Sequence, residues 1–492
     1  MGFKKGEDRY QVRLLPPAIE DYVPQNDEVR VIDALVDKLT GIKFQYSDFA
    51  GRGNQPYDPK DMLKIYIYCY LKGIRSSRKI EKECESNLKL IWLINGLTPD
   101  DKTICDFRKN NKEQLYQVLK EFTTICKKAK LFASELVAID GSKFEASCAK
   151  NKIFTREKLK HRLESIDYHI SNYLNQIEKN DILEMQQEKL TKEEIENIIS
   201  NLQEKRAEYQ KLSEELEKTD DKQISFTDSD CRLMKKRNGK CNPCYNVQVA
   251  SDSKYNMIVD FEVTNHTNDT QELSNMAIKA KEELGVDCPS KFRDKPEGCE
   301  RNLGVVTLKG EHSGGSDDEA AKCDTRLDEL KVVADSGYEN RVEFDTCIEN
   351  NIIPIVDIKS TEQGNGYFPK DKFVYDTERD LYICPAKREM YCVGHEIHKK
   401  GKKKLRHKIY KEKYRCKDCE LRKECFNNQN GSRRILRWEK EGIVDKMKTK
   451  ESREELRKRK GIIEPVFGVV KRCFGFEYVL TRGFGGVKAE FS

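Results

Sequence analysis

The stretch that decides the fold is VAIDGSKFEA, residues 137–146. Its apolar run before Asp140 predicts a buried strand, and the similar run Val332–Ala334 in the phrase VVADSGYEN predicts another. Each run ends at an aspartate, Asp140 in the first phrase and Asp335 in the second. A carboxylate at the end of a buried strand adds little to packing but is well placed to serve a site. We therefore expect both aspartates to belong to a functional site.

A third acid lies in the phrase IIEPVFGVVKR, residues 462–472. Apolar residues at helical spacing follow Pro465, and proline is favoured in the first turn of a helix. We therefore expect a helix that begins near Pro465. Glu464 and Lys471 are seven residues apart, which would place them on one face of that helix.

Three carboxylates from two strands and one helix could bind two magnesium ions. Mg²⁺ prefers oxygen ligands and keeps water and phosphate oxygens, so it needs few ligands from the protein. Two such ions can stabilise the attacking and the leaving oxygen of a phosphodiester displacement, and Mn²⁺ can replace Mg²⁺. Any one of these acids alone would be interpreted as a surface residue, and a lone Asp-Gly as a turn. Three acids in three distinctive phrases favour a site.

The phrases DGSKFEA, ADSGY and EPVFGVVKR resemble the three catalytic blocks of the insertion-sequence transposases, which have an RNase H-like core with an Asp-Asp-Glu triad. The resemblance implies that Asp140, Asp335 and Glu464 are the metal ligands. It also implies that Lys471 is the last residue of a Tyr-Arg-Glu-Lys signature that holds DNA phosphate. The expected fold is an α/β catalytic core with a mixed RNase H-like sheet, preceded by an all-α N-terminal domain.

Two features depart from the family pattern. Arg457 and Lys460 stand seven and four residues before Glu464, where the signature has tyrosine and arginine. The sequence also stops at Ser492, whereas the family usually continues for one more helical stretch. A truncated, inactive copy is therefore an expectation that competes with an active enzyme.

Residues 1–130 are expected to form a helical DNA-binding domain. The local pattern alone also fits a plain helical bundle, but GIRSSRKIEKECESNLKLIWL and TICDFRK resemble the N-terminal domain of the same transposases. Between residues 60 and 120 there are 13 Lys or Arg against 8 Asp or Glu, which favours a polyanionic partner near a carboxylate site. The expected DNA contacts are Arg75, Arg78, Lys79, Arg108, Lys460 and Arg472, with Arg482 as a further candidate.

Residues 131–492 are expected to form the catalytic domain with two insertions. Within 154–220, apolar residues recur every three or four positions, which predicts an antiparallel helical hairpin of coiled-coil type. Such a hairpin could contact a partner chain or DNA, or it could be an inert spacer. We expect strands at 245–249, 257–263 and 352–356, a helix at 272–284 and a loose polar insertion at 287–324.

The second insertion, 360–440, is rich in cysteine and basic residues. Residues 387–415 carry 12 Lys or Arg against 3 Asp or Glu. The pattern Cys…Cys-x2-Cys-x5-Cys is typical of a structural zinc site, because Cys-x2-Cys places two thiolates on one turn. The expected ligands are Cys384, Cys416, Cys419 and Cys425. Cys392 and His395 compete for the fourth position, and four free thiols remain the alternative.

The chain has 492 residues, 18 cysteines and a net charge of +6, which predicts two or three domains and thiols in a reducing compartment. It has neither an apolar run of about 20 residues that could span a bilayer nor an apparent signal peptide, so we expect a cytoplasmic, nucleoid-associated protein. The predicted function is a transposase that binds its element's terminal inverted repeats, then cleaves and joins DNA strands, as a homodimer on double-stranded DNA. The alternative is a catalytically inactive DNA-binding protein.

Overall fold

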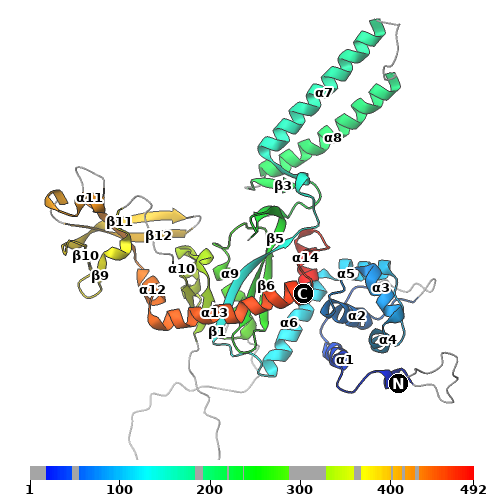
Figure 1. The fold of residues 1–492 in the computed structure, drawn as a ribbon, viewed down its shortest axis with the longest axis horizontal. Coiled ribbons are helices and arrows are strands. Elements are labelled where there is room, and N and C mark those ends of the chain that lie inside the picture. Colours follow the sequence, from blue (N-terminus) through cyan, green and yellow to red (C-terminus); the bar gives the residue numbers. More distant parts are fainter. Residues whose placement is uncertain are drawn as a thin grey trace, which may run out of the picture.

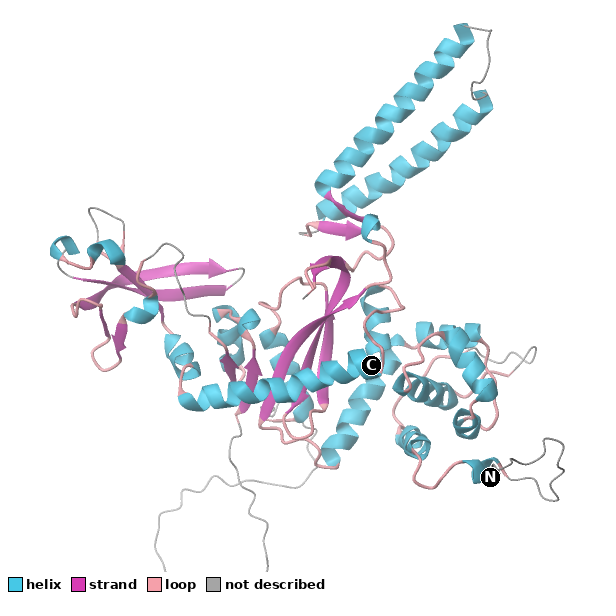
Figure 2. Cartoon of the chain, in the orientation of Figure 1, coloured by secondary structure: helices cyan, strands magenta, loops and turns pink. Residues whose placement is uncertain are grey.

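The computed structural model describes residues 18–46, 55–182, 192–218, 221–236, 238–286, 329–358, 367–400, 403–412, 416–426 and 432–492. Figure 1 shows a central sheet with a group of N-terminal helices on one side and a small second sheet on the other. A long helical hairpin projects from the central part, away from both (Figure 2). The predicted loose insertion at 287–324 lies outside the described residues.

The central sheet has six strands. They are β1 (Leu136–Glu145), β4 (Arg232–Lys235), β5 (Cys241–Asp252), β6 (Ile258–Thr264), β7 (Leu330–Ala334) and β8 (Ile352–Val356). Their order is β4-β5-β1-β7-β8, and β6 also pairs with β5. β1 runs antiparallel to β5 but parallel to β7, and β7 runs parallel to β8. The predicted mixed sheet is therefore confirmed.

Helices cover both faces of this sheet, and β1 shows why the sequence requires it. Val137 and Ile139 pack on one face with α9 (Leu273–Leu284) and α10 (Arg341–Glu349). Leu136 and Ala138 point to the other face, toward α13 (Lys450–Gly468). A strand buried on both faces needs a continuous apolar run, and each buried aliphatic side chain contributes roughly 1.5–3 kcal/mol. The run before Asp140 thus fixes β1 at the centre of the sheet.

Two of the expected element boundaries are wrong. β1 does not end at Asp140 but continues to Glu145, paired with β5 along its length, so Asp140 lies within the strand and the following glycine is not in a turn. No helix begins at Pro465, which lies inside α13 instead. Proline has no N–H for the carbonyl of Gly461, four residues earlier. That carbonyl accepts a hydrogen bond from the side chain of Asn256 at 3.1 Å, so a neighbouring loop supplies the donor that the helix lacks.

The helix path changes directly after Pro465. η6 (Val469–Cys473) is a π-helical turn that carries Lys471. Turns of this kind are rare and are frequently found at functional sites. The C-terminal helix α14 (Gly483–Phe491) then packs against α6 and β6.

The N-terminal region is helical, as expected. Its helices are η1 (Ile19–Tyr22), α1 (Glu28–Lys38), α2 (Pro59–Leu71), α3 (Ser77–Ser86), α4 (Leu88–Leu93), α5 (Asp101–Asn110) and α6 (Lys112–Lys128). Asp100 caps α5 by accepting a hydrogen bond from the backbone N–H of Thr103 at 2.7 Å. α6 extends from this group to the central part and packs against α9 and α14, so the two parts share a helix.

The projecting hairpin consists of α7 (Arg156–Ile182) and α8 (Lys192–Lys218). The short strands β2 (Ile153–Thr155) and β3 (Gln223–Ser225) pair at its base. Along its length, Arg206 forms an ion pair with Asp167 at 2.6 Å. Two long helices are thus observed within 154–220, while their coiled-coil character stays a prediction.

The second sheet contains β9 (Val374–Asp376), β10 (Leu381–Ile383), β11 (Glu389–Lys400), β12 (Lys403–Glu412) and β13 (Arg434–Trp438). Around it lie η4 (Lys370–Lys372), η5 (Cys416–Asp418), α11 (Arg422–Cys425) and α12 (Glu441–Met447), and α12 leads into α13. In the central part, η2 (Lys150–Lys152) and η3 (Ser336–Tyr338) complete the described elements. No helix in the described ranges is long and apolar enough to cross a membrane.

Candidate active site

A cleft of about 910 Å³ lies between β1, the end of β7 and the last turns of α13. It contains the three predicted acids and two of the predicted cations. These lining residues are Asp140, Asp335, Glu464, Lys471 and Arg472. Positions more than 300 residues apart in the sequence are thus brought to one place by the sheet and α13.

Asp140 is held from two sides. Its Oδ1 accepts a hydrogen bond from the backbone N–H of Gly141 at 2.9 Å, and its Oδ2 forms an ion pair with Arg459 of α13 at 3.2 Å. Burial raises the pKa of Asp140 to about 6, against the opposing effect of Arg459, and the nearby carboxylates of Asp335 and Asp269 raise it further. The cleft therefore disfavours another negative charge and would favour a cation.

Asp335 and Glu464 differ from Asp140 in having no cation beside them. Asp335 directly follows β7, as predicted, and its Oδ1 accepts a hydrogen bond from the backbone N–H of Gly337 at 2.8 Å. Glu464 is exposed on α13. Among the residues that the structure describes, neither carboxylate forms an ion pair. Both carboxylates are therefore available to a cation that enters the cleft.

Lys471 is a bound residue and not a free side chain on a helix surface. Its Nζ donates to the hydroxyl of Ser142 at 2.6 Å and to the carbonyl of Lys143 at 3.1 Å, and it lies 4.5 Å from the ring centre of Phe144. These contacts fix the ammonium group against β1, two residues beyond Asp140. The cleft therefore has a positive charge at a defined position.

Two further candidate residues of this site, Arg459 and Asp269, are not predicted by the sequence. Arg459 stands in a run of basic residues that resembles any solvated helix face, and only the fold shows that it reaches Asp140. Asp269 lies in the polar turn between β6 and α9 and lines the same cleft. No strand or helix pattern distinguishes Asp269 in the sequence, since the phrase TNHTNDT contains several polar residues of equal interest.

The predicted DNA-contacting residues are found in different settings. Arg75 is only 6% exposed, donates to the carbonyl of Tyr478 at 2.7 Å and pairs with the buried Glu490. This burial argues against a DNA contact, because Arg75 joins the N-terminal helices to the C-terminal segment. Arg108 is half-buried and donates to the hydroxyl of Tyr70 at 2.8 Å. Exposed side chains among the predicted contacts are Arg78, Lys79, Lys460, Arg472 and Arg482.

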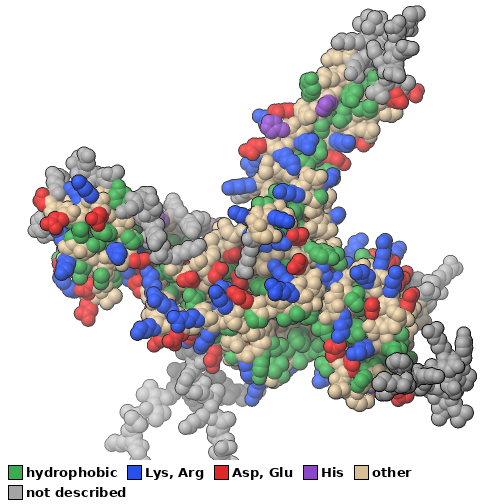
Figure 3. All heavy atoms as spheres, in the orientation of Figure 1, with side chains coloured by type: hydrophobic (Ala, Val, Ile, Leu, Met, Phe, Trp, Pro, Cys, Tyr) green, Lys and Arg blue, Asp and Glu red, His purple; other side chains and the backbone are tan. Residues whose placement is uncertain are grey.

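Charge is mixed over the visible face of the molecule. Lys and Arg side chains lie on the hairpin, the central part and the N-terminal helices, with acids between them (Figure 3). The net charge of +6 is therefore not concentrated in one patch on this face.

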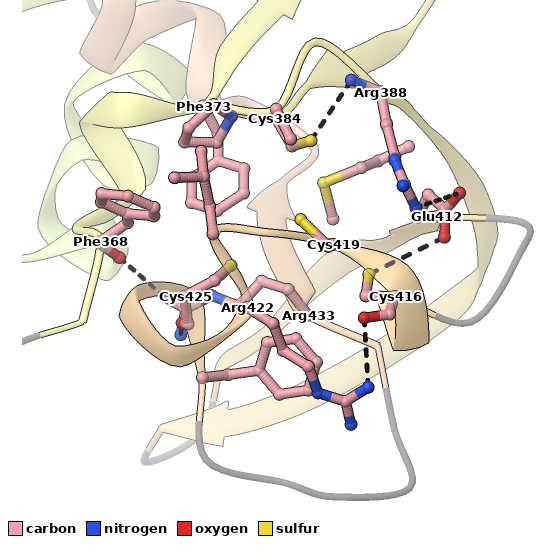
Figure 4. A pocket seen from close by; sticks show the side chains of 15 residues that line it. Phe368, Phe373, Cys384, Arg388, Glu412, Cys416, Cys419, Arg422, Cys425 and Arg433 are labelled. Carbon is pink, nitrogen blue, oxygen red and sulfur yellow. Dashed lines mark hydrogen bonds and ion pairs between the residues drawn. The ribbon is translucent and has the colours of Figure 1, made fainter.

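The four predicted zinc ligands line one small cavity of about 30 Å³ in the second sheet (Figure 4). These are Cys384, Cys416, Cys419 and Cys425. The Cys384 sulfur accepts a hydrogen bond from the backbone N–H of Arg388 at 3.3 Å. Burial raises the pKa of Cys425 to about 11, with the other three thiols adding to the rise and Arg433 opposing it. The competing candidates Cys392 and His395 do not line this cavity.

Neither the acids of the cleft nor the cysteines of the cavity are arranged as a set of metal ligands. Across the described ranges, no three His, Cys, Asp or Glu side chains are arranged so that they could hold an ion as they stand. The acids fit a divalent cation by their chemistry, since they supply oxygen ligands, and only Asp140 among them has a cation partner, Arg459, in the described ranges. A metal ion in either place would therefore require the side chains to move from the positions they have here.

Comparisons with known proteins identify both ends of the chain. A family model described as a transposase domain (DUF772) matches residues 17–110, and one described as a transposase DDE domain matches residues 383–492. The second range includes Glu464 and Lys471, while Asp140 and Asp335 lie outside both ranges. No curated protein is significantly similar in sequence.

One solved structure with detectable similarity is a cryo-EM structure of the piggyBac transposase synaptic complex with hairpin DNA. Its sequence identity is 7% and its TM-score 0.26, over 94% of this chain and 69% of that chain, which is too distant to support an argument. The two domain matches, at opposite ends of one chain, agree with each other. Both ends of the chain are therefore similar to domains of transposases, and the C-terminal end is similar to their DDE domain.

Proposed function

We propose that this protein is a transposase that cleaves and joins DNA strands at the acid cleft, using Asp140, Asp335 and Glu464 to hold two divalent cations. The observation that carries the proposal is the convergence of these three carboxylates on one 910 Å³ cleft. A DDE domain implies dependence on a divalent metal, typically Mg²⁺. When bound, such ions would stabilise the attacking and leaving oxygens of an in-line displacement at phosphorus.

The side chains of the cleft have separate tasks in this proposal. Asp140 and Asp335 are each anchored at Oδ1 by a backbone N–H group. Oδ2 of Asp140 also pairs with Arg459, so a metal ion bound there would share this oxygen with the guanidinium group. Glu464 is exposed, so it completes the metal site and is accessible to exchange a proton with the attacking water or 3′-hydroxyl. Lys471, held at a fixed position by Ser142, neutralises a phosphate beside the scissile bond.

The remaining DNA contacts are expected on exposed cations. Arg78 and Lys79 lie at the start of α3 and would bind the element end. Arg472 lines the cleft and Lys460 is exposed on α13, four residues before Glu464, and these two would bind the flanking backbone. Such phosphate contacts position DNA without reading its sequence. We further propose that two copies act together, since joining two element ends requires two active sites.

The cysteine cavity has a separate role in the proposal. Its four thiols surround a space of about 30 Å³, and one of them already accepts a backbone hydrogen bond. Closed four-thiolate sites are structural, so a zinc ion there would stabilise the second sheet without taking part in catalysis.

The function is tested with purified protein and linear DNA that carries the element's terminal inverted repeats. We expect strand cleavage and strand transfer with Mg²⁺ or Mn²⁺, and neither with EDTA. DNA-end binding without any cleavage in either metal would instead identify an inactive DNA-binding protein. Cleavage without strand transfer would instead identify the protein as a nuclease.

A further inference from the structure

The acid cleft contains a fourth carboxylate, Asp269, which neither the sequence motifs nor the domain matches single out. It lies in the turn before α9, and among the described residues no Lys or Arg forms an ion pair with it. Its charge is close enough to raise the pKa of Asp140. A fourth acid in this cleft requires an explanation, because only Asp140 has a cation partner in the described ranges and like charges repel one another in the absence of a cation.

The two oxygens of Asp269 have different surroundings. Oδ1 accepts hydrogen bonds from the side-chain amides of Gln248 at 2.6 Å and Asn246 at 2.7 Å, both on β5. Oδ2 accepts no hydrogen bond from the described residues. One side of this carboxylate is therefore fixed to the sheet, while the other is left for a ligand in the cleft.

The orientation of Gln248 is fixed in turn by Tyr338, the tyrosine of the DSGY phrase. The buried hydroxyl of Tyr338 donates to Oε1 of Gln248. Burial and the charges of Asp269, Asp140 and Asp335 raise the pKa of Tyr338 well above its usual value, so the hydroxyl keeps its proton. An amide whose oxygen accepts from Tyr338 must present its NH₂ group to Asp269. The strand-end phrase that supplies Asp335 thus also positions Asp269.

The free oxygen of Asp269 and a carboxylate oxygen of Asp335 both lie close to Gly337. A Cβ atom placed on Gly337 would lie 2.9 Å from Oδ1 of Asp335 and 3.8 Å from Oδ2 of Asp269. Gly141, the neighbour of Asp140, has no room for a side chain, because a Cβ there would lie 2.6 Å from Oδ1 of Asp269 and closer still to the amide of Gln248. Asp269 is therefore packed tightly between the two aspartate phrases.

We propose that Asp269 is a fourth metal-binding carboxylate of the acid cleft, with Gln248 and Tyr338 as the residues that position it. The proposal rests on the function proposed above. Oδ2 of Asp269 would act together with Asp335 on the same divalent cation. A purely structural aspartate would need only the two amide contacts at Oδ1, and the substitution Asp269→Asn preserves an oxygen for both of them.

The test is titration of the full-length protein with Mn²⁺ alone, by calorimetry and by thermal unfolding, without DNA. We expect Asp269→Asn to weaken Mn²⁺ binding by at least about tenfold, the size of effect seen when the support of a metal site is lost. The melting temperature without metal should stay the same or rise, because one like charge leaves the cleft. Tyr338→Phe should weaken Mn²⁺ binding in the same direction, but less.

Two reference variants separate the possible failures. Glu454→Gln, an exposed acid elsewhere on α13, should bind Mn²⁺ as the unmodified protein does. Asp335→Asn should lose binding if the proposed function is right. Weak binding in Asp335→Asn with unchanged binding in Asp269→Asn would overturn the role of Asp269 and leave the proposed function intact. Unchanged binding in both would overturn the proposed function itself.

Discussion

The acid cleft and the cysteine cavity were both predicted as metal sites, and they differ in size and construction. The cleft has a volume of about 910 Å³ and the cavity about 30 Å³. The cleft is thus about thirty times larger than the cavity by this measure. The difference in volume agrees with the proposal of a substrate site in the cleft and a structural ion in the cavity.

The two sites also differ in which parts of the chain supply their residues. The carboxylates come from β1, the end of β7 and α13, and only the complete fold brings them together. The cysteines lie between residues 384 and 425, within one small sheet and its loops. A metal in the cleft would therefore act on a scaffold that already exists, while a metal in the cavity would help to form its own scaffold.

The largest effect is expected at the acids. Asp140→Asn, Asp335→Asn and Glu464→Gln should each reduce Mg²⁺-dependent cleavage by at least about a thousandfold, since the loss of a single transition-state contact already costs 10²–10³ in rate. Binding to the element ends should be nearly unchanged, because the proposed role of these residues is to hold metal ions and not DNA. Cleavage rates and gel-shift affinities measure the two quantities separately. Cleavage by Asp335→Asn at the unmodified rate would show that the site is assigned wrongly.

The next effect concerns folding of the second sheet. We expect about one zinc ion per chain by elemental analysis, and its removal by a chelator should unfold residues 367–438 while the central sheet stays folded. Cys419→Ser should have the same effect, whereas Cys392→Ser, outside the cavity, should retain the metal. Absence of zinc together with four freely reactive thiols would leave the cavity as an ordinary apolar cluster.

Sequence alone was sufficient for the parts of the fold with a strong local pattern. The apolar runs before Asp140 and Asp335 predicted the two central strands, and the spacing in 272–284 predicted α9. The predicted helix start at Pro465 was wrong. The carbonyl of Gly461, which has no partner within the helix, accepts its hydrogen bond from Asn256, about 200 residues away in sequence. No local pattern can contain such a contact.

The sequence likewise predicted only those residues of the candidate site that stand in a recognisable local pattern. Acids that follow apolar runs are conspicuous, whereas Asp269 and Arg459 stand among other polar residues. Their position depends on how β5, α9 and α13 pack, which is a property of tertiary structure. Arg75 shows the opposite error, since a basic residue in a basic segment proved to be buried.

A smaller effect is expected at the ion pair between Arg459 and Asp140. Both side chains are largely buried, with exposed fractions of 11% and 13%. Arg459→Ala should therefore lower the free energy of unfolding of the metal-free protein by about 2 kcal/mol, as expected for a hydrogen bond to a charged group. The control Arg457→Ala, exposed on the same helix, should change it by less than about 0.5 kcal/mol.

Urea unfolding in EDTA provides this measurement, and a double-mutant cycle with Asp140→Asn isolates the pair. Arg459→Ala should cost less in the Asp140→Asn background than in the unmodified protein. Equal costs in both backgrounds would show that Arg459 contributes through packing and not through Asp140. Addition of Mn²⁺ should reduce the cost as well, because a cation in the cleft takes over the neutralisation of Asp140.

The smallest effect is expected at Lys471, and it tests whether the cleft also binds DNA. Lys471→Ala removes one ammonium group, so the slope of log affinity against log salt for the cleaved element end should become shallower by about 1. Ser142→Ala is a matched control, because it removes a hydrogen-bond partner of Lys471 but leaves the charge in place. The slope should be unchanged in that variant, although cleavage can slow if the ammonium group becomes less well positioned. A slope that stays the same in Lys471→Ala would mean that this lysine serves only to join η6 to β1, and the cleft would then bind DNA through its metal ions and through Lys460 and Arg472.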